Sequence, residues 1–400
     1  MHLDYDVIVA GAGPGGATVA RLCAQTGLRT LLVERERLPR YKACGGCLSL
    51  KSIQLLGFDL SPILENTVLG VKFTYCIHEP FWIKKERPIA FLVMRDRFDQ
   101  FLIEKGLEAG VEILDGNKVI HVEEKGDGIE IELAKGERFH CEYLVGADGP
   151  ESIVAKSLRL NGPRNDRGGV GLESEIPFES VKEFPKEDFS CIHLDFGGVP
   201  NGYGWVFPKR EGLSIGIGGM FEKGKKVNPL KYYNAFIGKL PYLQQGGKVR
   251  VLGHPLPAFY GEEQKVSRGK VLLVGDAAHL MDPLMGEGIY YALKSGMLAA
   301  ETILQSKEKG FSPSDLYQNL VRHELFENLK WALYFSRFVF RFTKMAYQTL
   351  LRYPELADLY LQVLEGKETY QGFVIKIKER IRDFLGGRLS EKIREAMTRI

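Results

Sequence analysis

The sequence predicts an α/β protein with a parallel nucleotide-binding sheet, an inserted antiparallel sheet and helices towards the C-terminus. Three stretches, residues 5–16, 143–150 and 270–279, each place an apolar run directly before a turn of small residues, as buried parallel strands do. Residues 169–251 largely alternate apolar and polar positions, which is typical of antiparallel strands. From Pro313 onward the pattern is helical.

The first of these stretches has the spacing of a dinucleotide-binding turn. After the apolar run Val7–Ala10, Gly11, Gly13 and Gly16 form G-x-G-x-x-G, and Glu34 ends the next predicted strand about 20 residues later. The first glycine permits the tight turn, the second lets backbone amides approach a pyrophosphate, and the third lets helix and strand pack closely. A carboxylate at Glu34 accepts hydrogen bonds from an adenosine ribose. The spacing predicts a site for FAD or NAD and does not decide between them.

Composition excludes several classes of protein. The chain has 400 residues, 44% hydrophobic and 26% charged, which is ordinary for a globular protein of two or three domains. A net charge of +3 without a basic run gives no support for nucleic-acid binding. No apolar stretch reaches the length of a membrane span, and the N-terminus enters a strand without a signal peptide. We therefore expect a cytoplasmic protein.

Only two of the six cysteines, Cys44 and Cys47, are closely paired. A Cys-x-x-Cys pair is either a redox dithiol or half a metal site. No second pair supplies further ligands, so we expect no metal, and flavin disulfide reductases separate their two cysteines by four residues rather than two. We favour a cofactor-contacting loop with one or both thiols unpaired, and a redox pair stays the alternative.

The remaining pattern predicts the elements between the turns. Expected strands are 70–77, 89–94, 112–114, 118–124, 129–133, 138–141, 170–176, 190–196, 204–207 and 213–218, of which those from 112 to 141 form a β-meander. Expected helices are 50–56, 95–109, 152–158, 231–239 and 289–305.

The third turn, Gly275 to His279, leads through a glycine-containing segment, 282–288, into a long helix. The N-terminus of that helix presents free amides and a partial positive charge. At the pyrimidine edge of a flavin it stabilises the anionic reduced form, and Asp276 is placed to hydrogen-bond ribityl or ribose hydroxyls. Three nucleotide-type turns in one chain indicate more than an ordinary glycine-rich helix entry.

Residues 331–347 read as one apolar helix with a narrow polar stripe of Arg337, Arg341 and Lys344, which Gln348 continues. One interpretation is a helix buried in its own domain. The other is a contact between residues 331–348 and a lipid surface, where cationic groups meet phosphates. We favour burial, because such helices usually find a partner within the fold.

With these motifs identified, the chain resembles the single-nucleotide-fold FAD enzymes of the para-hydroxybenzoate hydroxylase type. The matching residues are Gly11-Ala-Gly-Pro-Gly-Gly16, Gly146-Ala-Asp-Gly149 and Gly275-Asp-Ala-Ala278. Within that superfamily it is most similar to the geranylgeranyl reductase family, through residues 39–49, 202–208 (Gly-Tyr-Gly-Trp-Val-Phe-Pro) and 283–288 (Pro-Leu-Met-Gly-Glu-Gly). The family usually has glycine where this chain has Cys47, which leaves open a Cys44–Cys47 disulfide that switches activity.

The resemblance implies a Rossmann-type FAD-binding domain with an inserted antiparallel-sheet substrate domain and C-terminal helices. We assign residues 1–69, 95–165 and 266–310 to the FAD-binding domain, 70–94 and 166–265 to the substrate-binding domain, and 311–400 to a C-terminal helical region.

The resemblance also implies the site residues. The residues expected to contact FAD are Gly11, Gly13, Pro14, Gly15, Gly16, Glu34, Arg35, Cys44, Gly45, Arg95, Asp148, Gly149, Gly275, Asp276, Pro283, Gly286, Gly288 and Ile289. Cys47, Tyr203, Trp205 and Phe207 are expected to line a long apolar tunnel for the substrate. Cys44 is the candidate catalytic residue on the substrate side of the flavin, although a thiol in an apolar pocket is a reluctant acid. A bound water ranks equally as the proton donor, and Cys44 then only shapes the tunnel.

The implied reaction is reduction of isolated C=C bonds in a polyprenyl lipid of the geranylgeranyl type. Reduced flavin delivers hydride from N5 to one carbon while a proton reaches the other. One alternative is an FAD-dependent monooxygenase of an aromatic or polyketide-like substrate, which His279 keeps open. Another is a flavoprotein that carries electrons to a quinone. The expected electron donor is NAD(P)H or a ferredoxin-like carrier.

Overall fold

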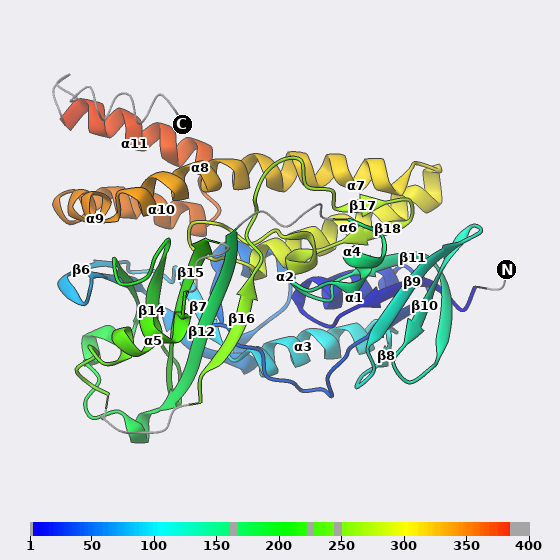
Figure 1. Cartoon of the computed structure of the whole chain (residues 1–400), viewed down its shortest axis with the longest axis horizontal. Helices are drawn as coiled ribbons and strands as arrows, with labels where there is room; N and C mark the ends of the chain where they lie inside the picture. Colours follow the sequence, from blue (N-terminus) through cyan, green and yellow to red (C-terminus); the bar gives the residue numbers. More distant parts are fainter. Residues whose placement is uncertain (1–2, 161–166, 223–226, 244–249, 385–400) are drawn as a thin grey trace.

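The computed structural model describes residues 3–160, 167–222, 227–243 and 250–384 (Figure 1). Two large sheets, a small third sheet and a group of C-terminal helices make up this part of the chain, which confirms the predicted mixed α/β fold. In Figure 1 the two large sheets lie side by side, and the helices after residue 310 run along the upper edge of both.

The first sheet has eight strands in the order β17–β18–β11–β1–β2–β8, with β10 and then β9 continuing from β11. The pairs β18–β11, β11–β1, β1–β2 and β2–β8 are parallel. The strands are β1 (Tyr5–Ala10), β2 (Thr30–Val33), β8 (Glu112–Leu114), β9 (Val119–Lys125), β10 (Gly128–Leu133), β11 (Arg138–Gly146), β17 (Ser267–Arg268) and β18 (Val271–Leu273). The central strand β1 is fully buried over Val7–Ala10, as its apolar run predicts.

Helix α1 (Pro14–Gln25) contacts this sheet and packs against α3 (Arg95–Glu108) and α6 (Ile289–Lys309). Gly11 has φ +105°, and a Cβ there would lie 2.3 Å from the carbonyl oxygen of Ala147. Only glycine therefore lets the turn after β1 lie against the turn after β11. The helices predicted at 50–56, 95–109, 152–158 and 289–305 are confirmed as α2 (Leu50–Leu56), α3, α4 (Ile153–Ser157) and α6.

Strand β11 differs from its prediction. The sequence predicts a meander strand at 138–141 and a separate strand at 143–146, but β11 is continuous from Arg138 to Gly146. Its first part pairs antiparallel with β10, and its later part pairs parallel with β18. The first residues of β11 are partly exposed and alternate in polarity, whereas the last four are all buried. The two patterns therefore predicted two separate strands.

The second sheet has seven strands in the order β16–β12–β15–β14–β13–β5–β6. Its strands are β5 (Gly70–Tyr75), β6 (His78–Lys84), β12 (Arg167–Pro177), β13 (Cys191–Phe196), β14 (Gly202–Pro208), β15 (Gly212–Glu222) and β16 (Leu252–Leu256). Tyr233 and Phe236 of α5 (Pro229–Ile237) join the core on one face of this sheet. The strands predicted at 170–176, 190–196, 204–207 and 213–218 and the helix at 231–239 are confirmed. The prediction missed β6, an exposed edge strand that contains Pro80.

A small sheet of β3 (Cys47–Ser49), β7 (Ala90–Val93) and β4 (Leu64–Val68) completes the strands. The sequence predicts β7 but not β3 or β4, because three to five residues carry too little periodicity. Pairing of Cys47 with Leu92 fixes the end of the cysteine loop. The domain boundaries assigned from the sequence stay predictions.

The C-terminal helices are α7 (Pro313–Val321), α8 (Glu327–Arg341), α9 (Thr343–Arg352), α10 (Glu355–Leu364) and α11 (Tyr370–Phe384), with a π-turn at Arg322–Phe326. The single helix predicted over 331–347 is therefore wrong. Helix α8 ends at Arg341, and Phe342 leaves the helical conformation with φ −125° and ψ 40°. The break turns α9 so that the Tyr347 hydroxyl donates hydrogen bonds to the carbonyls of Phe73 and Glu79 on the second sheet.

Burial within the fold describes part of this helix pair, and the contact of residues 331–348 with a lipid surface stays a prediction. Ala332 and Tyr347 are buried against the protein, whereas Arg337, Arg341 and Lys344 are exposed. None of the helices in the described ranges is both long and apolar enough to cross a membrane.

Candidate functional site

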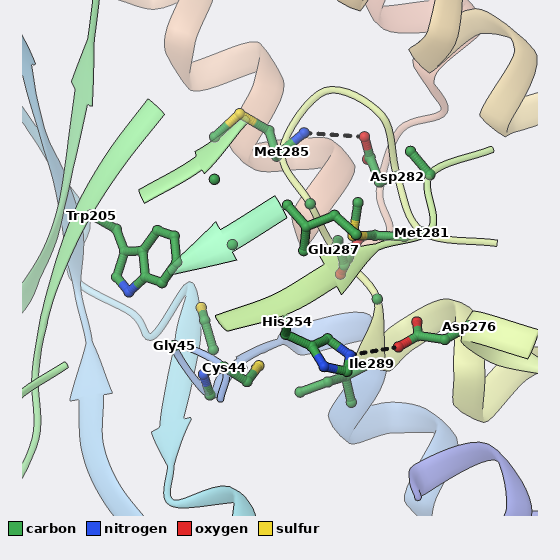
Figure 2. A pocket seen from close by; sticks show the side chains of 18 of the residues that line it. Cys44, Gly45, Trp205, His254, Asp276, Met281, Asp282, Met285, Glu287 and Ile289 are labelled. Carbon is green, nitrogen blue, oxygen red and sulfur yellow. Dashed lines mark hydrogen bonds and ion pairs between the residues drawn. The ribbon is translucent and has the colours of Figure 1, made fainter. Parts of the chain in front are cut away.

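One cavity lies where the two large sheets meet the C-terminal helices, and Figure 2 shows part of its lining. Its volume is about 270 Å³. It begins at the glycine turn after β1, passes the cysteine loop (residues 42–47) and the 281–289 loop, and ends against α8 and α10. Most of the predicted site residues line it: Gly13, Pro14, Gly15, Gly16, Cys44, Gly45, Cys47, Arg95, Gly149, Tyr203, Trp205, Phe207, Gly275, Asp276, Pro283, Gly286, Gly288 and Ile289.

The glycine turn is shaped for a bound phosphate group. A Cβ on Gly16 would lie 1.9 Å from the Gly11 carbonyl oxygen, so this glycine is required for helix and strand to pack. A Cβ on Gly13 would meet only one atom, of Arg40, at 3.9 Å, so this position opens onto the cavity. Helix α1 starts at Pro14 without a side-chain cap, which leaves its N-terminal dipole facing the opening. The cradle fits the pyrophosphate of FAD.

Glu34 is buried beside this turn, 4% exposed. Its Oε2 accepts a hydrogen bond from the Ala12 amide at 2.9 Å and lies 3.3 Å from Arg40 Nε. Arg40 also pairs with Asp99, which Arg95 binds through Nε at 2.9 Å. Burial alone would raise the pKa of Asp99, but the Arg95 guanidinium holds it below its ordinary value. The ion-pair chain keeps the loop after β2 fixed against α3.

Asp276 joins groups from distant parts of the chain. Its Oδ2 lies 3.2 Å from Lys42 Nζ and 3.6 Å from His254 Nε2, and Figure 2 shows His254 facing it. Burial opposes ionisation, yet Lys42 and His254 hold the pKa of Asp276 below its ordinary value. The sequence motif around the cysteines contained Lys42 without a stated role, and nothing in the sequence singled out His254.

The cysteine loop holds two free thiols. Cys44 receives a hydrogen bond at Sγ from the Gly46 amide, at 3.4 Å, and both cysteines line the cavity. Burial, together with the charge of Glu287, raises the pKa of the Cys47 thiol to about 12. The structure thus has the unpaired thiols that the sequence analysis favoured, while the disulfide switch stays a hypothesis.

Tyr203, Trp205 and Phe207 alternate along β14 and therefore share one face, with neighbouring ring centroids 6.4 and 6.2 Å apart. A Cβ on Gly216 would lie 2.2 Å from the Trp205 ring, so this glycine makes room for the indole. The Trp205 Nε1 atom is buried and has no hydrogen-bond partner among the described residues. It lies 3.3 Å from where a Cβ of Gly45 would be, at the cysteine loop.

The 281–289 loop is held from both sides. Asp282 Oδ1 accepts hydrogen bonds from the amides of Leu284 and Met285, at 2.6 and 3.2 Å, and its Oδ2 accepts one from the Tyr370 hydroxyl of α11. The Tyr203 hydroxyl donates to the Met285 carbonyl. Gly288 caps α6 without a side-chain hydrogen bond, so the helix N-terminus opens onto the cavity. Glu287 of this loop forms a buried ion pair of 2.6 Å with Lys51 of α2.

Four predicted cofactor residues lie outside the cavity lining: Gly11, Glu34, Arg35 and Asp148. Gly11 and Glu34 shape the turn, as described. The Arg35 side chain is 59% exposed and pairs with Glu36. Asp148 accepts a hydrogen bond from the Ile153 amide at 2.7 Å, the first amide of α4, whose N-cap is Ser152. Any contact of these residues with FAD stays a prediction.

The far end of the cavity contains residues that the sequence analysis missed. Phe340 of α8 and Tyr360, Leu361 and Leu364 of α10 close it, opposite Val71, Phe73, Ile192 and Leu194 of the second sheet. All eight side chains look like ordinary core residues, so no local signal distinguishes them. Within the described ranges no cluster of His, Cys, Asp and Glu side chains suits a metal ion.

Comparisons with known proteins match this geometry. Residues 4–194 match the FAD binding domain family, and residues 179–253 match the geranylgeranyl reductase catalytic domain. The chain is 30% identical to digeranylgeranylglycerophospholipid reductase of Thermoplasma volcanium, over 80% of this chain and 83% of that protein. It is 31% identical to an uncharacterized protein of Methanosarcina barkeri, over 92% of each chain.

A crystal structure of a geranylgeranyl bacteriochlorophyll reductase-like protein from Thermoplasma acidophilum has the same fold, with a TM-score of 0.77 at 24% identity. The alignment covers 94% of this chain and 98% of that one. These similarities over most of the chain agree with the glycine cradle and the three nucleotide-type turns in indicating one family. The chain belongs to the geranylgeranyl reductase family of FAD-dependent oxidoreductases.

Proposed function

We propose that this chain reduces isolated C=C bonds in the polyprenyl chain of a lipid. The observation that carries the proposal is the continuity of the cavity from the glycine cradle to an apolar end closed by α8 and α10. A polyprenyl chain is long and apolar, and burial of its methyl and methylene groups in such a tunnel is favourable. Reductases acting on geranylgeranyl groups are among the relatives of this chain.

When bound, reduced FAD supplies the hydride from its N5 atom. The N-terminal amides of α6, beyond Gly288, place a partial positive charge at the cavity wall and favour a negatively charged ligand there. Tyr203 and Asp282 hold the loop that presents these amides. The aromatic row on β14 keeps water away from the reacting carbons, which no carbonyl group activates.

An anaerobic experiment tests this function. The FAD-bound protein is reduced with dithionite, a geranylgeranyl lipid is added, and flavin reoxidation is followed together with the mass of the product. Reoxidation with a gain of two hydrogen atoms per turnover is expected. If the flavin stays reduced until oxygen enters and an oxygenated product then forms, the protein is a monooxygenase instead.

We also propose that NAD(P)H or a ferredoxin-like carrier supplies the electrons. Stopped-flow reduction of the FAD-bound protein by each donor in turn identifies which one acts. The donor is expected to reduce FAD faster than the lipid reoxidises it.

The α8–α9 surface supports a contact with a membrane that holds the lipid substrate. Phe342, Met345 and Leu351 are exposed there, beside the exposed cations Arg337, Arg341 and Lys344. Apolar side chains inserting between lipids and cations meeting phosphates make up a peripheral membrane contact. We propose this surface as the place where substrate enters from the bilayer.

A further inference from the structure

Glu173 is a buried carboxyl on the cavity side of β12, and the proposed reaction has so far given it no role. It is 1% exposed and lines the cavity. Glu173 pairs with Gly216 of β15, and Gly216 pairs with Trp205 of β14, so the three positions form one row across the sheet. Because Gly216 has no side chain, nothing projects from the strand between the carboxyl and the indole.

Hydrogen bonds hold the Glu173 carboxyl at the cysteine loop. Its Oε2 accepts from the Tyr41 hydroxyl at 2.7 Å and from the Cys44 amide at 3.2 Å, and its Oε1 accepts from the Ser214 hydroxyl at 3.2 Å. Lys209, which directly follows β14, binds Glu175 at 2.5 Å instead. Among the described residues, Glu173 therefore has neutral hydrogen-bond donors and no direct ion pair.

The surroundings favour the protonated form. Burial and then repulsion from Glu175 raise the pKa of Glu173 to about 7, against the opposing effects of Tyr41 and Lys209. The titratable and charged groups that face it from the packed elements are Glu175 on β12, Lys209 directly after β14, Tyr41 and Cys44 between β2 and β3, His254 on β16 and, through Ser174, Tyr233 on α5. At neutral pH a large fraction of Glu173 carries a proton.

We propose that Glu173 donates the proton that completes reduction of the C=C bond; this rests on the proposed function. One alkene carbon gains the hydride, and the π electron pair forms a bond from the other carbon to the Glu173 proton. The O–H bond breaks and leaves a carboxylate, which the Tyr41 hydroxyl, the Cys44 amide and Ser214 stabilise. Tyr41 is 42% exposed, so its hydroxyl links Glu173 to solvent protons for the next turnover.

This assignment replaces Cys44, the candidate acid of the sequence analysis, and Cys47 is no better placed. The pKa of Cys47, about 12, makes it a weak donor at neutral pH. Cys44 keeps a positioning role, since its backbone amide holds the Glu173 carboxyl.

Glu173→Gln tests the proposal, because an amide keeps the size of the side chain and removes the acidic proton. FAD content and the rate of reduction by dithionite are expected to stay at wild-type values. Anaerobic reoxidation by a geranylgeranyl lipid is expected to slow about 100-fold or more. In the wild-type protein this rate falls as the pH rises through about 7, as Glu173 loses its proton, and in the variant it no longer follows that titration.

Infrared difference spectra of the oxidised, FAD-bound protein give a readout independent of turnover. A protonated-carboxyl band that titrates at about pH 7 is expected in the wild type and absent from Glu173→Gln, whereas the band of Asp195, which titrates at about pH 6, remains in that variant. Asp195→Asn is the matched control, since Asp195 is also a buried carboxyl of this sheet, with its pKa raised to about 6, but lies outside the cavity lining. That variant is expected to keep the wild-type reoxidation rate.

Reoxidation of Glu173→Gln within threefold of the wild type, or an unchanged carboxyl band, would overturn the assignment while leaving the proposed function intact. If the lipid does not reoxidise the wild-type protein, both the proposed function and the role of Glu173 are wrong.

Discussion

The two ends of the cavity are built in different ways. At the cofactor end, Gly13, Gly15 and Gly16 follow one another in a single turn, and the ligand would meet mainly backbone groups. At the far end, side chains from the second sheet and from α8 and α10 meet, though these segments are far apart in sequence. The shape of the glycine turn at the cofactor end is therefore set by residues that are neighbours in sequence, whereas the far end forms only when distant segments pack together.

The largest expected effect breaks the cofactor end. In Gly16→Ala the new Cβ would lie 1.9 Å from the Gly11 carbonyl oxygen, so turn and helix must separate. We expect the free energy of unfolding to fall by about 3 kcal/mol, measured by thermal unfolding. We also expect the purified protein to lose bound FAD, measured by its flavin absorbance. Gly106→Ala in α3 is the control, because its Cβ would meet Val111 at an ordinary 3.5 Å. Retention of FAD by Gly16→Ala would show that the turn can move.

A second variant changes only the far end. Trp in place of Leu364 narrows the cavity beside α10, and we expect kcat/KM for a geranylgeranyl lipid to fall about tenfold, with a smaller loss for a geranyl lipid. FAD content stays unchanged if the two ends are independent. Gln362→Trp, on the same helix but outside the cavity lining, is expected to act like the wild type. Equal losses for both lipids would place the reacting bond elsewhere.

A third variant tests the ion pairs that join the two sheets beside the cofactor end. Because the pKa of Asp276 is below its ordinary value, its charged form stabilises the fold above about pH 4, and this contribution is lost as the pH falls further. Asp276→Asn is expected to cost about 1–3 kcal/mol at pH 7, because Lys42 loses its partner, and the difference from wild type shrinks in acid.

Chemical unfolding of the FAD-free protein at several pH values measures this difference. Asp127→Asn in an exposed turn is the matched control and should change little at any pH. A penalty for Asp276→Asn that is independent of pH would rule out the charge as its cause.

The smallest effect on the cavity is expected from substitutions on the exposed surface of α8 and α9. Arg337, Arg341 and Lys344 do not line the cavity, so reversing their charge to Glu is expected to leave its shape unchanged. We expect weaker sedimentation with anionic phospholipid vesicles and unchanged turnover of a detergent-dispersed substrate. Unchanged vesicle binding would remove this surface as the membrane contact. Reversal of Lys135, an exposed cation on the β9–β10–β11 side of the molecule, is the control.

Much of the cofactor end was predictable because its signals are short-range. The spacing of Gly11, Gly13 and Gly16 identified the turn, and residues 275–288 identified the entry to α6. The sequence did not predict side-chain contacts whose two partners are distant in sequence. Lys42 and His254 come from distant segments and both lie beside Asp276, and Tyr347 after the break at Phe342 hydrogen-bonds to the second sheet.

The sequence by itself therefore determined a dinucleotide site and the aromatic row on β14, because glycine spacing and strand alternation are properties of neighbouring residues. The resemblance of its motifs to a known family then identified the cofactor as FAD. Only the tertiary structure decided which helices close the tunnel. It also decided which carboxyl lies beside the cysteine loop. Glu173 reads in the sequence as one acid of an alternating strand, and its burial against Tyr41, Cys44 and Ser214 arises from contacts across three separate segments. A side chain's acidity depends on such an environment, which no local pattern encodes.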